Sequence, residues 1–219
     1  MIKEKILILD VLDCPGMRLE FESFGHVLVD ASEFTKNITG AEKWNSFDRS
    51  NTLLVFPGNG ASILRSYLPG EWLLQWHCVG VGAKRYWRPG EDPHIVVHRI
   101  FPERMILGIQ DVVILDDVIS SGQTCRKLRR VNMPWIPSAK WHAVTWVRQR
   151  GGAKLSEFTS LHSALEVGVA GPNHTDGVMA SIQSLSTLIR NEKIALSYAR
   201  RNLSELEGEK FLDVLQRLR

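Results

Sequence analysis

The sequence is poor in cysteine, in long apolar runs and in excess charge of one sign. Its three cysteines, Cys14, Cys78 and Cys125, show neither paired nor metal-ligand spacing, so we expect free thiols in a reducing cytoplasm. No apolar run approaches the ~18 residues of a membrane-spanning helix, and no charged-then-apolar leader is present. The net charge of +3 is too small to indicate a nucleic acid partner. We therefore expect a cytoplasmic globular protein without a membrane or nucleic acid partner.

The sequence does contain a regular alternation of strand-like and helix-like segments. It has 219 residues, of which 44% are hydrophobic, enough for the core of one α/β domain over residues 1–219. Strands separated by helical patterns predict a mainly parallel five-stranded sheet flanked by helices. Three further expectations are a strand at 72–79, a long mobile loop at 80–93 and an amphipathic helix at 178–189.

The most informative segment is 112–124, VVILDDVISSGQT. Val112–Leu115 is typical of a strand buried on both faces, and Asp116 and Asp117 follow where that strand should end. A hydroxyl- and glycine-rich turn then leads into a basic helix, whose free N–H groups suit a phosphate. Two carboxylates beside a phosphate site suit a polyhydroxyl sugar, a divalent cation or both. The pattern predicts a pocket for a phosphorylated sugar, and the alternative is an acidic pair that only caps a helix.

At these residues the chain resembles the type I phosphoribosyltransferases, whose signature is an apolar strand, an acidic pair and a Ser/Thr-Gly-x-Thr turn. The resemblance implies that Asp116 and Asp117 bind the ribose hydroxyls of phosphoribosyl pyrophosphate (PRPP) and meet Mg²⁺ indirectly, through those hydroxyls and water. It also implies that the 5-phosphate binds a segment here called the phosphate turn: Ser120, Ser121, Gly122, Gln123 and Thr124. A P-loop is excluded because no Gly-Lys-Ser/Thr follows the glycine.

A second candidate site follows the predicted strand at Thr52–Phe56. Two glycines directly after a buried strand let backbone amides approach an anion closely. In the resembled family, the loop at this place holds pyrophosphate. The corresponding segment, here called the pyrophosphate turn, consists of Pro57, Gly58, Asn59 and Gly60. The alternative is a tight structural turn.

A third candidate is the glycine-rich basic stretch from Gly80 to Arg99. A cationic loop that closes over pyrophosphate would stabilise the charge that develops on this leaving group. Relatives such as the orotate enzyme use lysine and arginine in a loop placed here, and Lys84, Arg85 and Arg88 are the matching kind of residue. The alternative is a solvated basic loop. A nucleic acid patch is disfavoured because the basic residues form no broad stripe.

The resemblance also bears on the acceptor base. The 6-oxopurine enzymes usually place an Asp third after the acidic pair, to handle the base proton, whereas this chain has Ser120. This favours a pyrimidine such as orotate, adenine or an unusual base over hypoxanthine or guanine. The uracil enzymes usually keep one acidic residue in the pair, so two count mildly against uracil.

The resemblance implies a family core at about 50–171 and a variable hood from 1–50 and 171–219. The loop Gly171–Gly177 could contact a base or cap the next helix, and the helical tail could cover the site or join a homodimer. The leading hypothesis is catalytic transfer from PRPP to a nucleobase-like acceptor. The alternatives are a non-catalytic PRPP- or nucleotide-binding regulator of the same fold and a partner-binding protein with a vestigial site.

Overall fold

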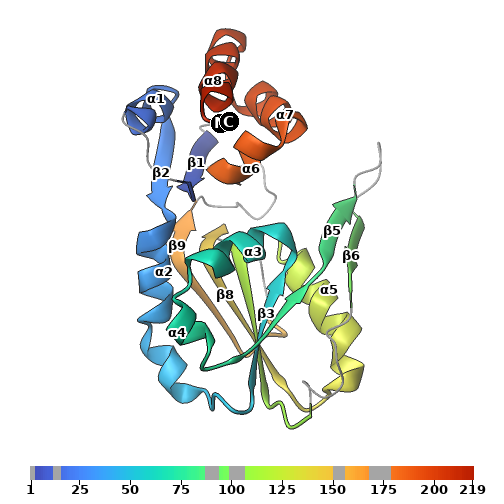
Figure 1. Ribbon diagram of the computed structural model, residues 1–219. Helices are drawn as coiled ribbons and strands as arrows, with labels where there is room; N and C mark the ends of the chain where they lie inside the picture. Colours follow the sequence, from blue (N-terminus) through green and yellow to red (C-terminus); the bar gives the residue numbers. More distant parts are fainter. Residues whose placement is uncertain (1–2, 12–15, 87–93, 99–106, 150–155, 168–178) are drawn as a thin grey trace. The chain divides into compact units, whose positions relative to one another are not determined.

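The computed structural model of the chain describes residues 3–11, 16–86, 94–98, 107–149, 156–167 and 179–219 (Figure 1). The chain divides into two compact units. The larger unit is Phe34–Glu166, and the smaller unit combines Met1–Glu33 with Val167–Arg219. The expectation of one domain over 1–219 stays a prediction. No helix among the described residues is long and apolar enough to cross a membrane.

The larger unit contains a five-stranded sheet in the order β4-β3-β7-β8-β9. Its strands are β3 (Thr52–Pro57), β4 (His77–Val81), β7 (Asp111–Ile119), β8 (Lys140–Gln149) and β9 (Ser160–Val167). β3 pairs in parallel with β4 and β7, and β7 pairs in parallel with β8. His142 contacts Ser160 and Arg148 contacts Glu166, both at a separation of 18 residues, so β9 also runs parallel. The predicted five-stranded parallel sheet is confirmed.

Burial explains why β7 is central. Val112–Leu115 are all 0% exposed, as expected for a strand covered on both faces. In the larger unit the helices are α2 (Ala31–Thr39, which begins in the smaller unit), α3 (Gly58–Tyr67), α4 (Gly70–Leu73), α5 (Gln123–Asn132) and the 3-10 helices η1 (Glu42–Ser46) and η3 (Met133–Trp135). Leu128 of α5 packs in one core cluster with Val112 and Ile114. Figure 1 shows α3 and α5 beside the sheet, each following a strand's carboxyl end.

The expectation of a loop at 80–93 is wrong for its first half. β4 continues to Val81, and β5 (Ala83–Tyr86) then pairs antiparallel with β6 (His94–Val97). The hairpin forms because Ile95 and Val97 are buried in the same core cluster as Leu128. Residues 87–93 lie outside the described residues.

The strand expected at 72–79 is also wrong at its start. Gly70–Leu73 forms α4 instead, and the strand begins at His77. Trp72 packs its ring against Trp44, at 5.0 Å between centroids, and against Trp76, at 5.6 Å. This aromatic cluster joins a helical turn to η1, and its contacts are not visible in the local apolar pattern.

The smaller unit has a three-stranded sheet in the order β10-β1-β2, with both pairings parallel. Its elements are β1 (Lys3–Leu9), α1 (Met17–Ser23), β2 (His26–Asp30), β10 (Met179–Ser184), α6 (Leu185–Arg190), α7 (Glu192–Asn202) and α8 (Glu205–Arg217). The helix expected at 178–189 is therefore wrong in its first half. β10 pairs with β1, which is some 175 residues away in sequence (Lys3↔Met179), so a local period could not reveal it.

His26 lies inside the core of the smaller unit. Its ring stacks on Phe211 at 5.4 Å between centroids. Nδ1 lies 3.0 Å from the carbonyl of Phe21, which can only accept, so Nδ1 carries the hydrogen. Nε2 then accepts from the Tyr198 hydroxyl at 3.1 Å. Burial lowers the pKa of His26 from 6.5 to about 4, so this packing uses the neutral ring.

We expect the smaller unit to lose stability as the pH falls from about 6.5 to about 4. The unfolded chain takes up the proton at its higher pKa while the folded state resists it, so acid favours unfolding by up to ~3 kcal/mol. His26→Gln should flatten this part of the pH dependence. The measurement is hydrogen exchange of the backbone amides of α7 and α8 across this pH range. Tryptophan fluorescence is not suitable, because all seven tryptophans lie between Trp44 and Trp146 and report on the larger unit.

His77→Gln, at an exposed histidine of the larger unit, is the matched control and should leave the exchange of α7 and α8 unchanged. Equal pH dependence in wild type and His26→Gln would show that this ring does not couple folding to protonation.

Candidate functional site

The acidic pair lies on the part of β7 that extends beyond its pairing with β3. That pairing ends at Val55↔Ile114, whereas pairing with β8 continues past Asp116↔Thr145. Asp116 is buried, at 9% exposure, and Asp117 is half-buried. The backbone N–H of Asp117 donates to Asp116 Oδ1 at 3.1 Å. Both carboxylates therefore stand at the carboxyl edge of the sheet, where open α/β sheets bind ligands.

The pyrophosphate turn meets the acidic pair at Gly60. A Cβ on Gly60 would lie 2.2 Å from Asp117 Oδ1 and 2.5 Å from Asp117 Cγ. Since real Cβ atoms do not approach other atoms so closely, the Asp117 carboxylate occupies the space that any other residue's side chain would need. The two segments, separated by more than fifty residues in sequence, thus lie in direct contact.

The base of the β5–β6 hairpin reaches the same turn. Gly58 has φ +70, a conformation that favours glycine, and its Cβ would lie 3.0 Å from the Ala83 carbonyl oxygen. Within the hairpin, a Cβ on Gly82 would lie 2.5 Å from Cδ2 of the His98 ring, which would have to shift. Glycine is therefore favoured at Gly58, where the turn and the hairpin approach each other.

The phosphate turn is held to the first turns of α5 by hydrogen bonds from Arg126. Gly122, with φ +69, is the N-cap of α5, and it supplies no side-chain acceptor to the first turn of the helix. Arg126 N donates to the Gly122 carbonyl at 3.0 Å, and Arg126 Nη2 donates to the Ser121 carbonyl at 2.5 Å. Side-chain capping is absent at this N-terminus within the described residues, which leaves the first-turn N–H groups available to an anion.

The buried side of the site is apolar. Cys125, in the first turn of α5, is 1% exposed and belongs to the core cluster. Burial, with a smaller contribution from the negative charge of Asp116, raises the pKa of the Cys125 thiol. Cys125 is therefore a neutral packing residue and not a nucleophile.

The predicted loop cations are only partly described. Lys84 is exposed on β5, opposite Val96 of β6. The backbone of Arg85 pairs with Ile95, and Arg88 lies outside the described residues. The structure brings together the acidic pair, the two turns and the base of the hairpin, while contact of these three cations with a ligand stays a prediction.

Two supporting residues escaped the sequence analysis. Thr145 Oγ1 donates to the Asp117 carbonyl at 2.9 Å from the neighbouring strand, and Arg126 holds the phosphate turn from α5. Thr145 is a lone polar residue in the apolar run Ala143–Val147, which is the signal that could have indicated it. The contact of Arg126 depends on side-chain direction, which sequence spacing does not provide.

A second polar cluster lies at the opposite, amino-terminal edge of the sheet. Ser160 Oγ lies 2.8 Å from His142 Nδ1, and His142 Nε2 lies 3.0 Å from Asp111 Oδ1. The Phe47 and His142 rings form a T-shaped pair at 4.8 Å between centroids, and burial lowers the pKa of His142. This chain of hydrogen bonds ties the starts of β7, β8 and β9 beneath an aromatic cover, which is a structural role.

The acidic pair also fits a hydrated magnesium ion. Mg²⁺ prefers carboxylate oxygens and commonly keeps waters and substrate oxygens as its other ligands. Among the described residues, no group of three or more His, Cys, Asp or Glu could form an all-protein cage. Two carboxylates supply only part of an octahedral shell, so water or other ligands would complete the coordination of such an ion.

No family model and no curated protein matches this chain. Among solved structures, a protein from Aquifex aeolicus is 15% identical with a TM-score of 0.49, over 80% of this chain and 91% of that one. A purine phosphoribosyltransferase from Pyrococcus horikoshii is 13% identical with a TM-score of 0.46, over 81% and 92%. A xanthine-guanine-hypoxanthine phosphoribosyltransferase from Helicobacter pylori is 14% identical with a TM-score of 0.42, over 69% and 84%. Likeness at this level transfers no activity or substrate to this chain.

We expect Gly60→Ala to destabilise the larger unit by ~1–2 kcal/mol, because its Cβ must displace the Asp117 carboxylate. Gly80→Ala is the matched control, since a Cβ on Gly80 meets nothing within 4 Å. Urea unfolding followed by tryptophan fluorescence measures both. The double variant Gly60→Ala/Asp117→Ala should recover most of the loss, because it removes the clashing group. Equal stability of the two glycine variants would contradict the close contact.

Proposed function

We propose that the chain is a phosphoribosyltransferase, which transfers ribose 5-phosphate from PRPP to a nitrogenous base and releases pyrophosphate. The observation that carries this proposal is the contact between Gly60 and the Asp117 carboxylate. It joins two segments, of which the family resemblance assigns one to the ribose and the other to pyrophosphate. In this arrangement a single ligand can contact both segments.

The roles of the residues follow from their chemistry. Asp116 and Asp117 accept hydrogen bonds from the 2- and 3-hydroxyls of the ribose, and Asp117 is the more exposed of the two. The phosphate turn binds the 5-phosphate through first-turn N–H groups of α5 and the hydroxyls of Ser121 and Thr124. The pyrophosphate turn supplies backbone amides at Gly58–Gly60. Magnesium, when bound, neutralises charge on the pyrophosphate.

In the proposed reaction a base nitrogen attacks C1 of the ribose, and the bond from C1 to the pyrophosphate oxygen breaks with its electron pair on that oxygen. The transition state has oxocarbenium character, so no covalent nucleophile is needed. The chain contributes by orienting the ribose and by supporting the leaving group electrostatically. The thiol of the buried Cys125 stays neutral, which is consistent with a reaction that uses no covalent nucleophile.

The acceptor is proposed to be a pyrimidine, adenine or an unusual base more readily than hypoxanthine or guanine. Ser120 stands where a 6-oxopurine enzyme usually has a proton-handling Asp. Among the described residues, no carboxylate or imidazole hydrogen-bonds to the Ser120 hydroxyl, which leaves it a poor general base. We also propose a cytoplasmic homodimer: the free thiols Cys78 and Cys125 suit a reducing compartment, and the family resemblance implies the dimer.

The test is pyrophosphate release from PRPP and Mg²⁺ with a panel of free bases. We expect release with at least one base of the favoured group. Asp116→Asn/Asp117→Asn should weaken PRPP binding at least ~100-fold in calorimetry, because charge-assisted hydrogen bonds to two hydroxyls are lost at roughly 1.5–3 kcal/mol each. Circular dichroism checks that the double variant stays folded.

Two outcomes contradict the proposal in different ways. PRPP binding without pyrophosphate release for any base would identify the chain as a non-catalytic binding protein. Unchanged PRPP affinity in the double Asn variant would show that the acidic pair does not hold the ribose.

We further expect Lys84→Ala/Arg85→Ala/Arg88→Ala to lower turnover by at least ~100-fold while leaving the affinity for ribose 5-phosphate within ~2-fold. These three charges act on the leaving group in the proposed reaction, whereas the phosphate turn is untouched. Steady-state rates and calorimetry measure the two effects. Lys36→Ala/Lys140→Ala/Lys210→Ala removes the same charge at exposed positions elsewhere and should change neither quantity. An unchanged rate in the hairpin variant would assign these residues to a solvated connection.

A further inference from the structure

A cationic pocket lies beside α5 and adjoins the phosphate turn at Gln123 and Arg126. Its volume is about 610 Å³, within the range of small-molecule sites. The lining comes from one stripe of α5, from the start of η3, from β6 and from one acidic residue: Gln123, Arg126, Lys127, Arg129, Arg130, Met133, Ile95 and Glu157. All of these residues belong to the larger unit.

The charge of this pocket is unbalanced. Four cations line it against one carboxylate, Glu157. Among the described residues, the side chains of Lys127, Arg129 and Arg130 form no ion pair, and the buried Arg129 Nε has no hydrogen-bond partner. A buried donor without a partner costs free energy that an anionic ligand would recover.

Helix electrostatics do not account for this cluster. Arg129 and Arg130 lie in the last turn of α5, where positive charge is favourable. Arg126 and Lys127 lie in the first half of the helix, near the positive end of its dipole, where further positive charge is unfavourable. The packing of α5 does not need them either, because its buried residues are Cys125, Leu128 and Asn132.

The other lining residues suit a ligand that carries apolar and hydrogen-bonding groups as well as phosphates. Ile95 and Met133 provide apolar surface, and Gln123 and Glu157 provide hydrogen-bonding groups. Apolar contacts suit the faces of a base, polar groups suit its edge or a ribose, and clustered cations suit a chain of phosphates. We propose that this pocket binds a nucleoside polyphosphate at a site separate from the acidic pair.

The position of the pocket suggests what binding would do. Gln123 belongs to the phosphate turn, and Arg126 donates to the Ser121 carbonyl of that turn. Ile95 pairs with Arg85 across the hairpin. A ligand that bridges α5 and β6 therefore links the phosphate turn to the strands that carry Lys84 and Arg85. The site is regulatory, and this part of the inference depends on the proposed function, whereas ligand binding itself does not.

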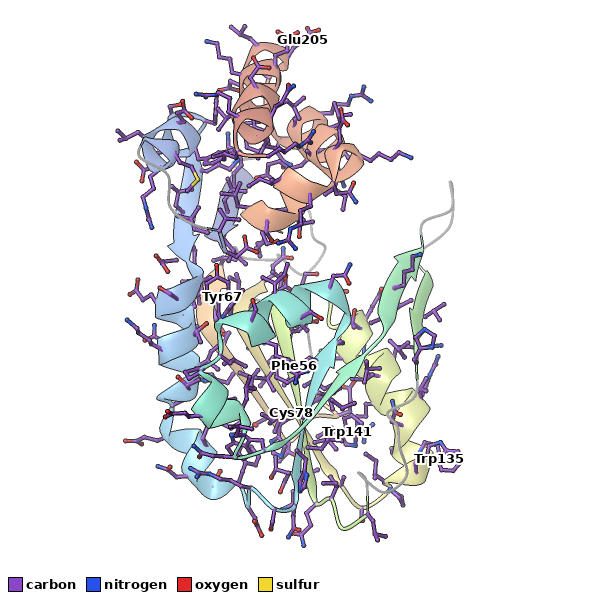
Figure 2. The ribbon with its side chains drawn as sticks, viewed as in Figure 1. Phe56, Tyr67, Cys78, Trp135, Trp141 and Glu205 are labelled. Atoms are coloured by element: carbon purple, nitrogen blue, oxygen red, sulfur yellow. The ribbon has the colours of Figure 1, made fainter. Side chains whose placement is uncertain are left out.

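The test is titration of the full chain with ATP and GTP in calorimetry. Lys127→Gln/Arg130→Gln should weaken binding by at least ~10-fold, since charge-assisted contacts are lost. Lys36→Gln/Lys140→Gln removes the same charge from exposed positions outside the pocket and should bind within ~2-fold of wild type. Neither pair belongs to the acidic pair or the turns, and thermal unfolding verifies that both variants are folded. Figure 2 shows Trp135 projecting outward near the end of α5, where its 49% exposed ring is available to report binding by fluorescence.

Competition separates this inference from the proposed function. Saturating PRPP should not displace the nucleotide, and Asp116→Asn/Asp117→Asn should retain nucleotide affinity even if it never binds PRPP. Equal affinity of the two charge variants, or complete displacement by PRPP, would overturn a separate site. Equal affinity for inorganic tripolyphosphate and ATP would overturn the nucleoside part. Tighter, pocket-dependent binding of a single-stranded oligonucleotide would overturn the small-molecule assignment.

Discussion

The structure of the larger unit depends on the parallel pairing of β3 with β7. The register runs from Thr52↔Asp111 to Val55↔Ile114, so the two strands point their carboxyl ends to the same edge of the sheet. The pyrophosphate turn follows one strand and the acidic pair continues the other. The paired residues Leu53–Val55 and Val112–Ile114 are all 0% exposed, so a change of register would disturb close packing on both faces of the sheet. The contact between Gly60 and Asp117 is a consequence of this pairing.

Around this pairing, small residues determine how closely the segments approach. Gly58 lies where a Cβ would meet Ala83 at the base of the hairpin, and Gly60 lies where a Cβ would meet the Asp117 carboxylate. Larger side chains there would separate the turn from the carboxylates, and a shared ligand could not contact both. The Arg126 contact to the Ser121 carbonyl extends the same organisation to α5, which connects the candidate site to the cationic pocket.

The smaller unit is held together by contacts of a different kind from those of the larger unit. Its sheet joins strands from both ends of the chain, and its core centres on a neutral histidine stacked among aromatic rings. Asp10, which follows β1, accepts from Ser186 N at 2.8 Å and so satisfies the start of α6. The buried neutral ring of His26, whose pKa is lowered to about 4, makes this unit more sensitive to acid than an entirely apolar core would be.

The sequence by itself determined the buried central strand, the order of acidic pair, turn and helix, and the glycines after Thr52–Phe56. These features are local, because apolar runs, glycine conformations and helix starts are written in consecutive residues. Only the tertiary structure decided that Gly60 meets Asp117, that the stretch after Gly80 begins as a hairpin, and that β10 pairs with β1. It also decided that four cations of α5 face one pocket with Ile95 and Glu157. Each of these depends on contacts between residues far apart in sequence, whose energies no local pattern contains.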